Sequence, residues 1–500
     1  MTAPIGYVNA KVTTGSTAMS TDIDTIYIGG EWVTPSSTNK IEIHSPTTGK
    51  PVGSVIAAGG RDVDRAVAAA RTAFDDPGGW SSWEPADRAA ALAEFARQYQ
   101  LVAEDMVRTV CQQNGMPISQ AAQLEGAVPG MLLTYYADLI KKLPISLTRQ
   151  SPAGTRTLVS HFPVGVVAAI TPWNFPQTLS AFKYVPALAA GNAVVLKPSP
   201  ETPLDALLLA EVADKAGLPA GVFNVLPGAT DVGRALVNSV GVDKVSFTGS
   251  TSAGKEVAST CGRLLKPVML ELGGKSAAVI LDDPGLDLSE FADRLFAATL
   301  LNTGQTCFAS TRILASRRRY DEVIDFFTAM AQSLTIGDPL DPNTQIGPLV
   351  SAAQREKVER YIKQGLADGG TITTGGRRPP HLPSGYFIEP TIFAGLDNRS
   401  AVAREEIFGP VLTIIAYDDE DDAIRIANDS EYGLGGTVWS PDHHHAIAVA
   451  ARIRSGTVGI NHYLPNVTAA YGGIKDSGLG RELGPEGLQG FQNLKSIFLT

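Results

Sequence analysis

Short apolar runs alternate with amphipathic segments through the middle of the chain. The runs are uninterrupted, which is typical of strands that are buried on both faces of a parallel sheet. Segments with the helical spacing of apolar residues lie between them. The runs are "VGVVAAI" (164–170), "AVVLKPS" (193–199), "VFNVLPG" (222–228) and "KVSFTGS" (244–250), and helices are predicted over 179–191, 202–217 and 230–240. This alternation predicts an α/β fold with a doubly wound parallel sheet.

A second α/β unit is predicted to begin near Lys275. The run "SAAVILDD" (276–283) follows "VMLELGG" (268–274), and a helix over 288–301 leads into a loop that contains Cys307. Further elements are predicted at "TRILA" (311–315), "PVLTIIAY" (410–417) and "GTVGI" (456–460) as strands, and over 320–334 as a helix. The chain therefore divides into at least two lobes.

The region before these units is predicted to begin helically. Apolar residues from Val63 to Phe74 recur at helical spacing, and a second, longer amphipathic helix over 85–114 ends at Gly115. Residues 143–161 lose this period, contain Pro and Gly, and alternate around Thr157. We expect a projecting strand pair there, which could serve as an oligomerisation arm.

The two ends of the chain differ in polarity. The first twenty residues are polar and have no basic cluster followed by an apolar run, so we expect a loose arm and no targeting signal. The tail "LQGFQNLKSIFLT" (488–500) ends in an apolar, strand-like run. An unpaired edge of that kind is costly to leave in water, so a partner subunit is the expected cover.

Composition narrows the class of partner to small molecules. At 500 residues the chain is too long for one core, and clefts between lobes are where small ligands bind. The net charge of −10 disfavours nucleic acid and an anionic membrane surface, which both need a basic face. Three cysteines (Cys111, Cys261 and Cys307) without a CxxC pair indicate neither a disulfide framework nor a zinc site, which fits a reducing cytoplasm.

Three residues have side chains suited to catalysis. Cys307, between small and polar residues, could be an inert core residue, a metal ligand, half of a disulfide or a nucleophile. Glu271 ends an apolar strand before two glycines, so its carboxylate is either satisfied by backbone donors or has a raised pKa that suits a general base. Asn174 follows another buried strand, where its amide either caps a turn or donates to an oxyanion.

Two further segments fit a nucleotide site, although each has an ordinary alternative. "FTGSTSAG" (247–254) follows a strand and opens a helix, so its amides either hold a pyrophosphate or simply form a turn. Lys197 lies at the carboxyl end of a parallel strand, where such sheets bind ligands, but a solvated lysine is the alternative.

Taken together, these motifs resemble the aldehyde dehydrogenase family along nearly the whole chain. The matching segments are "TPWNFP", "LKPSPETP", "FTGSTSAG", "LELGGKS", "GQTC", "EEIFGPV" and "GGIKDSGLGRELG", in the family order. The resemblance implies a Rossmann-like nucleotide-binding domain over 22–142 and 162–273, a catalytic domain over 274–475, and a small β oligomerisation arm over 143–161 and 486–500, with 1–21 as a loose segment.

The resemblance implies oxidation of an aldehyde to the carboxylic acid with NAD. Cys307 falls on the family nucleophile, which forms a thiohemiacetal and then a thioester. Asn174 falls on the side-chain donor to the oxyanion, and Glu271 on the base that activates water to hydrolyse the thioester. Glutamate at this position favours hydrolysis over transfer to coenzyme A. Lys183 matches a lysine near the active site.

The resemblance also places the cofactor. The matching positions are Ile170, Thr171, Pro172, Trp173, Lys197, Ser199, Pro200, Gly249, Ser250, Leu272, Glu406 and Phe408. One departure affects the choice of dinucleotide: Pro200 stands where many members have a ribose-binding glutamate, and Glu201 is shifted by one. Loss of that carboxylate makes NADP possible, but no Lys or Arg follows to pair with a 2′-phosphate, so NAD is favoured.

The expected substrate tunnel is aromatic and uncharged. The resemblance suggests Phe175, Phe182, Thr306, Phe308 and Tyr463 as its lining. This set favours an apolar or aromatic aldehyde over an anionic semialdehyde, which would need an arginine. Plain core packing is the alternative for the same aromatics.

The remaining signals support simpler interpretations. The run His443–His445 resembles a metal cluster, but adjacent helical residues diverge and no carboxylate partner is evident, so we expect a solvated helix start and no metal. Cys111 and Cys261 are expected to be packing residues.

Self-association as a homodimer or homotetramer is expected. Two other classes remain open at this point: a cofactor-independent thiol esterase, and a binding protein that has lost catalysis.

Overall fold

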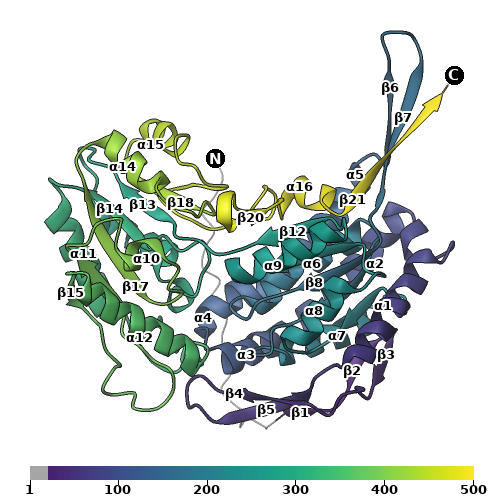
Figure 1. Ribbon diagram of the computed structural model, residues 1–500, viewed down its shortest axis with the longest axis horizontal. Coiled ribbons are helices and arrows are strands. Elements are labelled where there is room, and N and C mark those ends of the chain that lie inside the picture. Colours follow the sequence, from purple (N-terminus) through teal and green to yellow (C-terminus); the bar gives the residue numbers. More distant parts are fainter. Residues whose placement is uncertain (1–20, 500) are drawn as a thin grey trace.

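The computed structural model describes residues 21–499. Figure 1 shows two lobes side by side, with a ribbon of strands that projects from the first lobe. The segment predicted to be loose, residues 1–21, lies outside the described residues except for Thr21, which begins strand β1 (Thr21–Ile23).

The first lobe is built on an eight-stranded sheet in the order β20-β12-β11-β8-β9-β10-β2-β3. Its five central strands are parallel, and β20, β2 and β3 add antiparallel edges. The strands are β2 (Ile26–Ile28), β3 (Glu31–Val33), β8 (Val166–Ile170), β9 (Ala193–Lys197), β10 (Phe223–Val225), β11 (Lys244–Thr248), β12 (Val268–Glu271) and β20 (Gly478–Leu479). The predicted α/β fold is confirmed.

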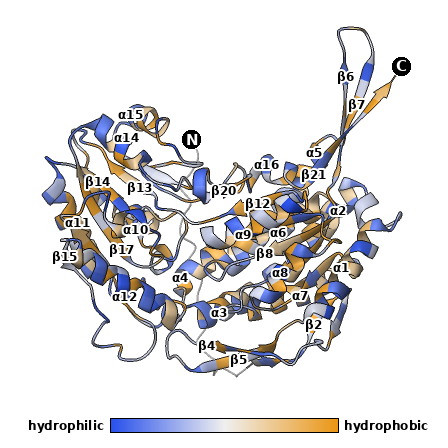
Figure 2. Cartoon of the chain, in the orientation of Figure 1, coloured by the Kyte–Doolittle hydropathy of each residue, from blue (hydrophilic) through white to orange (hydrophobic). Residues whose placement is uncertain are grey.

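Helices cover both faces of this sheet, which explains its uninterrupted apolar runs. Val167 and Ala169 of β8 pack in one cluster with α6 and α7, whereas Val166 and Ala168 pack in another with α1, α8 and α9. The helices are α1 (Gly60–Asp75), α6 (Pro176–Ala189), α7 (Leu204–Lys215), α8 (Thr230–Asn238) and α9 (Thr251–Arg263). Apolar residues are accordingly concentrated in the strands (Figure 2).

The expectation that this lobe begins helically is wrong. Strands β1, β4 (Lys40–His44) and β5 (Pro51–Ile56) form a small sheet before α1, and β2 and β3 join the large one. Most of these strands have only three to six residues and mix exposed with buried positions. Their apolar pattern is therefore too short to stand out.

The long helix predicted over 85–114 is two helices. α2 (Pro85–Leu101) and α3 (Ala103–Asn114) meet at Val102, which has φ −114° and ψ 9°. Val102 still packs against the core, so the apolar period continues across the break. Gly115 ends α3 in the left-handed region (φ 84°), as predicted. The short 3-10 helix η1 (Trp80–Ser82) precedes α2. After α3 the chain continues through α4 (Ile118–Ala121), the π-helical turn η2 (Ala122–Ala127) and α5 (Val128–Lys142).

The second lobe contains a seven-stranded sheet in the order β15-β16-β17-β14-β13-β18-β19, in which only the edge strand β15 is antiparallel. Its strands are β13 (Ala277–Ile280), β14 (Arg312–Ser316), β15 (Thr371–Thr374), β16 (Thr391–Ala394), β17 (Val411–Tyr417), β18 (Gly436–Trp439) and β19 (Gly459–Ile460). Strands β13, β14, β17 and β19 were predicted, whereas β15, β16 and β18 were missed.

The helices of this lobe lie between its strands along the chain. They are η3 (Leu288–Phe291), α10 (Ala292–Thr299), η4 (Leu301–Gly304), α11 (Tyr320–Ser333), α12 (Ala352–Ala367), α13 (Ala401–Arg404), α14 (Glu420–Asn428) and α15 (His443–Ala450). After the last strand of this lobe, η5 (Lys475–Ser477) and α16 (Gly484–Gln489) return to the first lobe, where α16 packs against α6. The helix predicted over 288–301 is therefore a 3-10 turn and a short α-helix that lead toward Cys307.

The projecting arm has three strands rather than two. β6 (Ser146–Gln150) and β7 (Arg156–Pro163) form the predicted pair, and β21 (Gln492–Leu499) lies antiparallel to β7 along its whole length. The C-terminal run thus pairs within its own chain, which corrects the expectation of an unpaired strand. Its Phe498 is nevertheless 83% exposed. Among residues 21–499, no helix is both long and apolar enough to cross a bilayer.

His445 contradicts the interpretation of residues 443–445 as simply solvated. Its Nδ1 lies 2.9 Å from Asp283 Oδ1 and its Nε2 lies 2.6 Å from Glu420 Oε2, and Glu420 also pairs with Arg452. The imidazole of His445, in α15, therefore connects the segment after β13 with the start of α14. Within the described part of the chain, no group of three or more His, Cys, Asp or Glu side chains is arranged to hold a metal.

We expect this junction to stabilise the second lobe only at lower pH. The hydrogen bond to Glu420, followed by that to Asp283, raises the pKa of His445 above its usual value. The contribution is therefore complete below the ordinary histidine pKa of about 6.5 and is lost as the pH rises through the raised pKa. His445→Gln should destabilise the protein by up to about 1 kcal/mol at pH 6, because such exposed pairs are weak.

Thermal unfolding followed by circular dichroism at pH 6 and pH 9 measures this effect. The difference between His445→Gln and the unsubstituted protein should disappear at pH 9. The exposed neighbour gives the control, since His444→Gln should have little effect at either pH. A His445→Gln deficit of equal size at both pH values would contradict the prediction.

Candidate active site

Cys307 lies on a tightly bent loop where the two lobes meet. Asn302, Thr303 and Gly304 all have positive φ (51°, 58° and 71°), and a Cβ at Gly304 would overlap the backbone carbonyl of Gly409. Glycine is therefore required at that position. Gln305 fixes the loop by accepting a 2.9 Å hydrogen bond from the N–H of Val350 at its side-chain oxygen.

The Cys307 thiol is buried, and the first lobe lies directly against it. Its side chain is 8% exposed, and a Cβ at Gly274 would overlap the Cys307 carbonyl, so the strand connection after β12 passes in contact with the loop. Burial, followed by the negative charge of Glu271, raises the pKa of the thiol well above its usual value. All three cysteines are unpaired and buried, which excludes the disulfide alternative for Cys307 within this chain.

Glu271 ends β12 with its carboxyl group buried beside this thiol. Both carboxyl oxygens lack a hydrogen-bond partner among the described residues, so backbone donors do not satisfy them. Burial is the main cause that raises the pKa of Glu271 to about 8; Glu482 raises it further and Lys183 opposes the shift. Of the two alternatives for this carboxylate, the structure favours the raised pKa.

Asn174 is tied to the loop of Cys307 from the first lobe. It follows β8, and its side-chain amide donates a 3.0 Å hydrogen bond to the Gln305 carbonyl. The backbone carbonyl of Asn174 accepts a 2.9 Å hydrogen bond from the Asn302 side chain and a 3.3 Å hydrogen bond from the Asn114 side chain. The amide is thus anchored within two residues of Cys307, with one N–H used by the loop.

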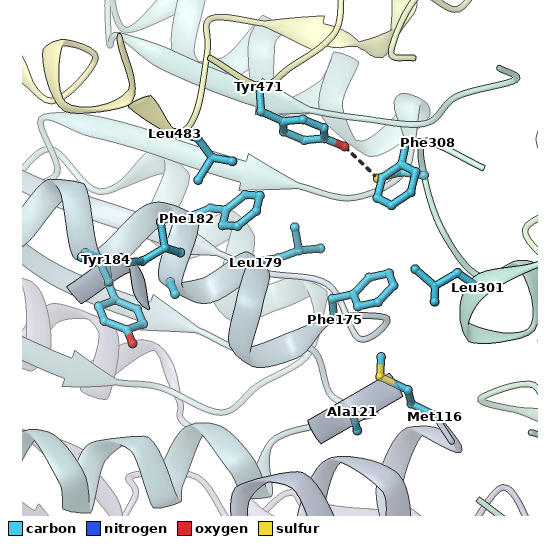
Figure 3. Close-up of a cluster of buried hydrophobic side chains, with 14 of the residues drawn as sticks. Met116, Ala121, Phe175, Leu179, Phe182, Tyr184, Leu301, Phe308, Tyr471 and Leu483 are labelled. Carbon is cyan, nitrogen blue, oxygen red and sulfur yellow. Dashed lines mark hydrogen bonds between the residues drawn. The ribbon is translucent and has the colours of Figure 1, made fainter. Parts of the chain in front are cut away.

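Two residues of this site were missed from the sequence. The hydroxyl of Tyr471 lies 3.5 Å from the Cys307 sulfur (dashed line in Figure 3). Glu482 forms a 2.7 Å ion pair with Lys183, and both side chains are almost completely buried. Glu482 belongs to the motif "GGIKDSGLGRELG" and Tyr471 directly precedes it, so that motif was the available signal.

The residues expected to line the tunnel lie in the buried region that contains Cys307. Phe175, Phe182, Thr306, Phe308 and Tyr463 are all buried, and their apolar members belong to one cluster with Cys307. The rings of Phe308 and Tyr463 lie 4.7 Å apart, and Phe182 meets Tyr471 edge to face at 6.0 Å. Figure 3 adds other apolar members of this cluster that the sequence did not single out: Met116, Ala121, Leu179, Tyr184, Leu301 and Leu483.

Most of the expected cofactor residues follow the carboxyl ends of neighbouring parallel strands. Ile170 ends β8 and Thr171 to Trp173 follow it, and Lys197 ends β9 before Ser199 and Pro200. Gly249 and Ser250 follow β11, and Leu272 follows β12. These strand ends lie at one edge of the sheet because the strands are parallel. Leu272 packs so closely against α9 that a Cβ at Gly254 would overlap its side chain.

Lys197 is buried rather than solvated. Its side chain is 5% exposed, and burial lowers its pKa to about 8, against the opposing charges of Glu201 and Asp231. Glu201 in turn accepts a hydrogen bond from the Ser199 hydroxyl. The carboxylate displaced by Pro200 therefore still lies near Lys197.

Glu406 and Phe408 bring the second lobe to the same edge. Glu406 accepts a 2.9 Å hydrogen bond from the N–H of Gly274, and the Phe408 ring meets Trp173 edge to face at 5.3 Å. Burial raises the pKa of Glu406, and the bond from Gly274 opposes this shift. Two cavities elsewhere, of about 970 and 620 Å³, include none of the expected site residues in their lining.

Comparison with known proteins agrees with this geometry. The sequence model of the aldehyde dehydrogenase family matches residues 32–497. The chain is 51% identical to geranial dehydrogenase of Castellaniella defragrans over 481 residues, which cover 96% of this chain and 100% of that protein.

Solved structures show the same likeness. An aldehyde dehydrogenase of Mycobacterium tuberculosis complexed with NAD+ has a TM-score of 0.94 at 45% identity, covering 96% of this chain and 99% of its own. A mutant of aldehyde dehydrogenase C from Pseudomonas syringae, complexed with NAD+ and octanal, has a TM-score of 0.91 at 37% identity, covering 98% of each chain. The chain therefore belongs to the aldehyde dehydrogenase family and is an enzyme that oxidises aldehydes to carboxylic acids.

Proposed function

We propose that this enzyme oxidises apolar aldehydes with NAD, using Cys307 as the nucleophile, Asn174 as an oxyanion donor and Glu271 as the base for hydrolysis. The observation that carries the proposal is the burial of an unpartnered carboxyl, Glu271, beside the Cys307 thiol, with the Asn174 amide anchored to the same loop. The cofactor-independent esterase is not favoured, because the relatives of this chain are dehydrogenases.

Cys307 holds the substrate carbon covalently through oxidation. Its thiolate forms a bond to the aldehyde carbon, and the carbonyl electron pair moves to oxygen. The Asn174 amide and the Cys307 N–H are the donors that stabilise this oxyanion. Covalent capture makes the oxidation step intramolecular, and a thioester on Cys307 results.

Glu271 completes the reaction by activating water. Its raised pKa makes it a stronger base than an ordinary carboxylate, and its unpartnered oxygens are free to accept a proton. The hydroxide equivalent attacks the thioester carbon, the C–S bond breaks, and the acid leaves while Cys307 regains its thiolate or thiol.

The edge of the first sheet fits a dinucleotide. The thirteen-residue helix α9 begins there with Ser250 as its N-cap, and its free N–H groups suit a pyrophosphate. The hydroxyl of Thr248 is buried there without a partner among the described residues, and Lys197 brings a buried amine. Trp173 would lie near the pyrophosphate, as Ser250 would, and Glu406 and Phe408 would hold the nicotinamide end. NAD, when bound, supplies the hydride acceptor.

We further propose that NAD is preferred over NADP. The Glu201 carboxylate, held by Ser199 beside Lys197, takes the place of the glutamate that Pro200 replaces. A carboxylate there suits ribose hydroxyls and repels a 2′-phosphate.

The lining of the tunnel supports an apolar substrate. The rings of Phe175, Phe182, Phe308 and Tyr463 are buried in the same apolar cluster as Cys307. An apolar chain would gain burial among them, whereas a second carboxylate would lose its hydration. The names of the relatives, geranial dehydrogenase and an octanal complex, agree with this class.

The wider organisation is also a proposal. We propose nucleotide-binding, catalytic and arm domains with the boundaries given above, and a homodimer or homotetramer that pairs through the arm, where Leu494 and Phe498 are exposed. A cytoplasmic location fits three unpaired cysteines.

Replacing the nucleophile should abolish oxidation. Cys307→Ser is expected to lower kcat/KM by at least about a thousandfold, because an alcohol at this site lacks the thiolate's reactivity. Formation of NADH with an aliphatic aldehyde measures the loss. Cys261→Ser, which removes a thiol from α9, is the control and should retain activity. Substantial oxidation by Cys307→Ser would refute the assignment.

Removing the base should separate the two halves of the reaction. Glu271→Gln should still release about one equivalent of NADH per site in a first burst, whereas steady turnover should fall by roughly 10²–10⁴-fold. In the unsubstituted enzyme, hydrolysis should accelerate as the pH rises through about 8, where Glu271 becomes ionised, and the variant should lose this dependence. Stopped-flow measurement of NADH gives both phases; loss of the burst together with turnover would contradict the assignment.

One kinetic screen tests substrate and cofactor together. The kcat/KM for geranial or octanal should exceed that for succinic semialdehyde by about tenfold or more, because a carboxylate would be desolvated in the tunnel.

The kcat/KM for NAD should likewise exceed that for NADP by about tenfold or more, a scale consistent with repulsion of a phosphate by one carboxylate. Preference for the semialdehyde or for NADP would overturn the corresponding part of the proposal.

A further inference from the structure

Tyr471 is held rigidly in the loop between β19 and η5. Its N–H and carbonyl each form a 2.7 Å hydrogen bond with the backbone of Glu482, and its ring packs against Phe182. The side chain is 2% exposed. Because the backbone and ring are both fixed, the hydroxyl has a defined position in the wall of the tunnel.

The hydroxyl of Tyr471 has the Cys307 sulfur as its hydrogen-bond partner. Its one hydrogen bond among residues 21–499 joins it to the Cys307 sulfur, 3.5 Å away. Burying a hydroxyl in an apolar wall costs free energy unless it has a good partner, and phenylalanine would fill the same space without that cost. The neighbouring Tyr463 differs, because its hydroxyl pairs with that of Thr457. Packing alone therefore does not explain a tyrosine at position 471.

The surroundings of Cys307 make such a donor useful. The charged groups with the largest effect on the thiol are Glu271, from β12, and Glu406, from the second lobe, and both carboxylates oppose its ionisation. The tyrosine hydroxyl is the group that favours the anion. Tyr471 itself stays protonated, since burial and the charges of Cys307 and Glu271 raise its pKa well above the usual value. It can therefore act only as a neutral donor near neutral pH.

We propose that Tyr471 is a further catalytic residue, whose hydroxyl donates a hydrogen bond to the Cys307 sulfur and thereby stabilises the thiolate over the thiol. This inference rests on the proposed role of Cys307 as nucleophile. In the ionisation step the S–H bond breaks, its electron pair stays on sulfur and the proton passes to solvent water. A hydrogen bond to an ion is stronger than one to a neutral group, so the bond shifts this equilibrium toward the nucleophile.

Alkylation of Cys307 by iodoacetamide measures the thiolate directly. The rate is followed against pH by loss of activity, with mass spectrometry to confirm the modified residue. Tyr471→Phe should move the profile to higher pH and leave about three- to tenfold less thiolate at a given pH below its midpoint. This is the scale of the difference between a hydrogen bond to an ion and one to a neutral group. Its kcat/KM for octanal should fall most at low pH and approach that of the unsubstituted enzyme at high pH.

Tyr463→Phe is the matched control, because it removes a buried hydroxyl from the same tunnel without touching sulfur. Its alkylation profile should coincide with that of the unsubstituted enzyme. Tyr471→Leu gives a second test should the first variant fold poorly, and it should show the same displacement.

Two results would overturn the proposal. One is a Tyr471→Phe alkylation profile that coincides with the unsubstituted profile, even if KM for aldehydes rises, since the ring would then only line the tunnel. The other is an equal displacement in Tyr463→Phe. Neither result bears on the proposed function, whose own failure would appear as oxidation retained by Cys307→Ser.

Discussion

Two acidic groups, the Cys307 thiol and the Glu271 carboxyl, share one buried space, and neither can ionise without raising the cost for the other. Burial raises both pKa values. The charge of Glu271 raises the pKa of the thiol further, whereas the neighbouring Cys307 thiol lowers that of Glu271. This coupling suits a reaction in two stages. When the sulfur is bound to carbon it carries no charge, so the carboxylate can form beside it at the stage where a base is needed. The hydrogen-bonded neighbours of the pair determine how this balance is set.

The scaffold keeps this space intact through close backbone contacts between the lobes. Gly274, after β12, passes against the Cys307 carbonyl, where a larger residue would push the lobes apart. Within the second lobe, Gly304 passes against the carbonyl of Gly409, which holds the loop of Cys307 in place. Glu406 then fastens the second lobe to the N–H of Gly274. The same residues that position the nucleophile thus also hold the edge where the dinucleotide is expected. Displacement of one lobe would therefore disturb both functions.

The sequence predicted the elements that a run of apolar residues marks. It did not predict features that depend on the surroundings of a single side chain. β8, β9 and β11 were predictable because burial on both faces requires an uninterrupted apolar run. β4 was not, since only one of its five residues is buried, and β16 was missed although its four residues are all buried. The chemistry of Glu271 was left as two alternatives, because only the packed structure shows that its oxygens have no partner among the described residues. Tyr471 was missed, since a tyrosine beside a glycine pair has no pattern of its own, and its contact with Cys307 spans 164 positions.

The surroundings of Glu201 show that a carboxylate can lie near Lys197 although it stands one position later in the sequence than the resemblance predicts. Pro200 has no side chain that can bond ribose, and a motif read letter by letter therefore predicts the loss of a carboxylate. After β9 the chain is no longer in a ladder, so neighbouring residues are not required to point to opposite sides. The Ser199 hydroxyl donates a hydrogen bond to the Glu201 carboxylate. That charge is close enough to Lys197 to oppose, in part, the lowering of its pKa by burial. A carboxylate therefore lies near Lys197 even though proline stands at position 200.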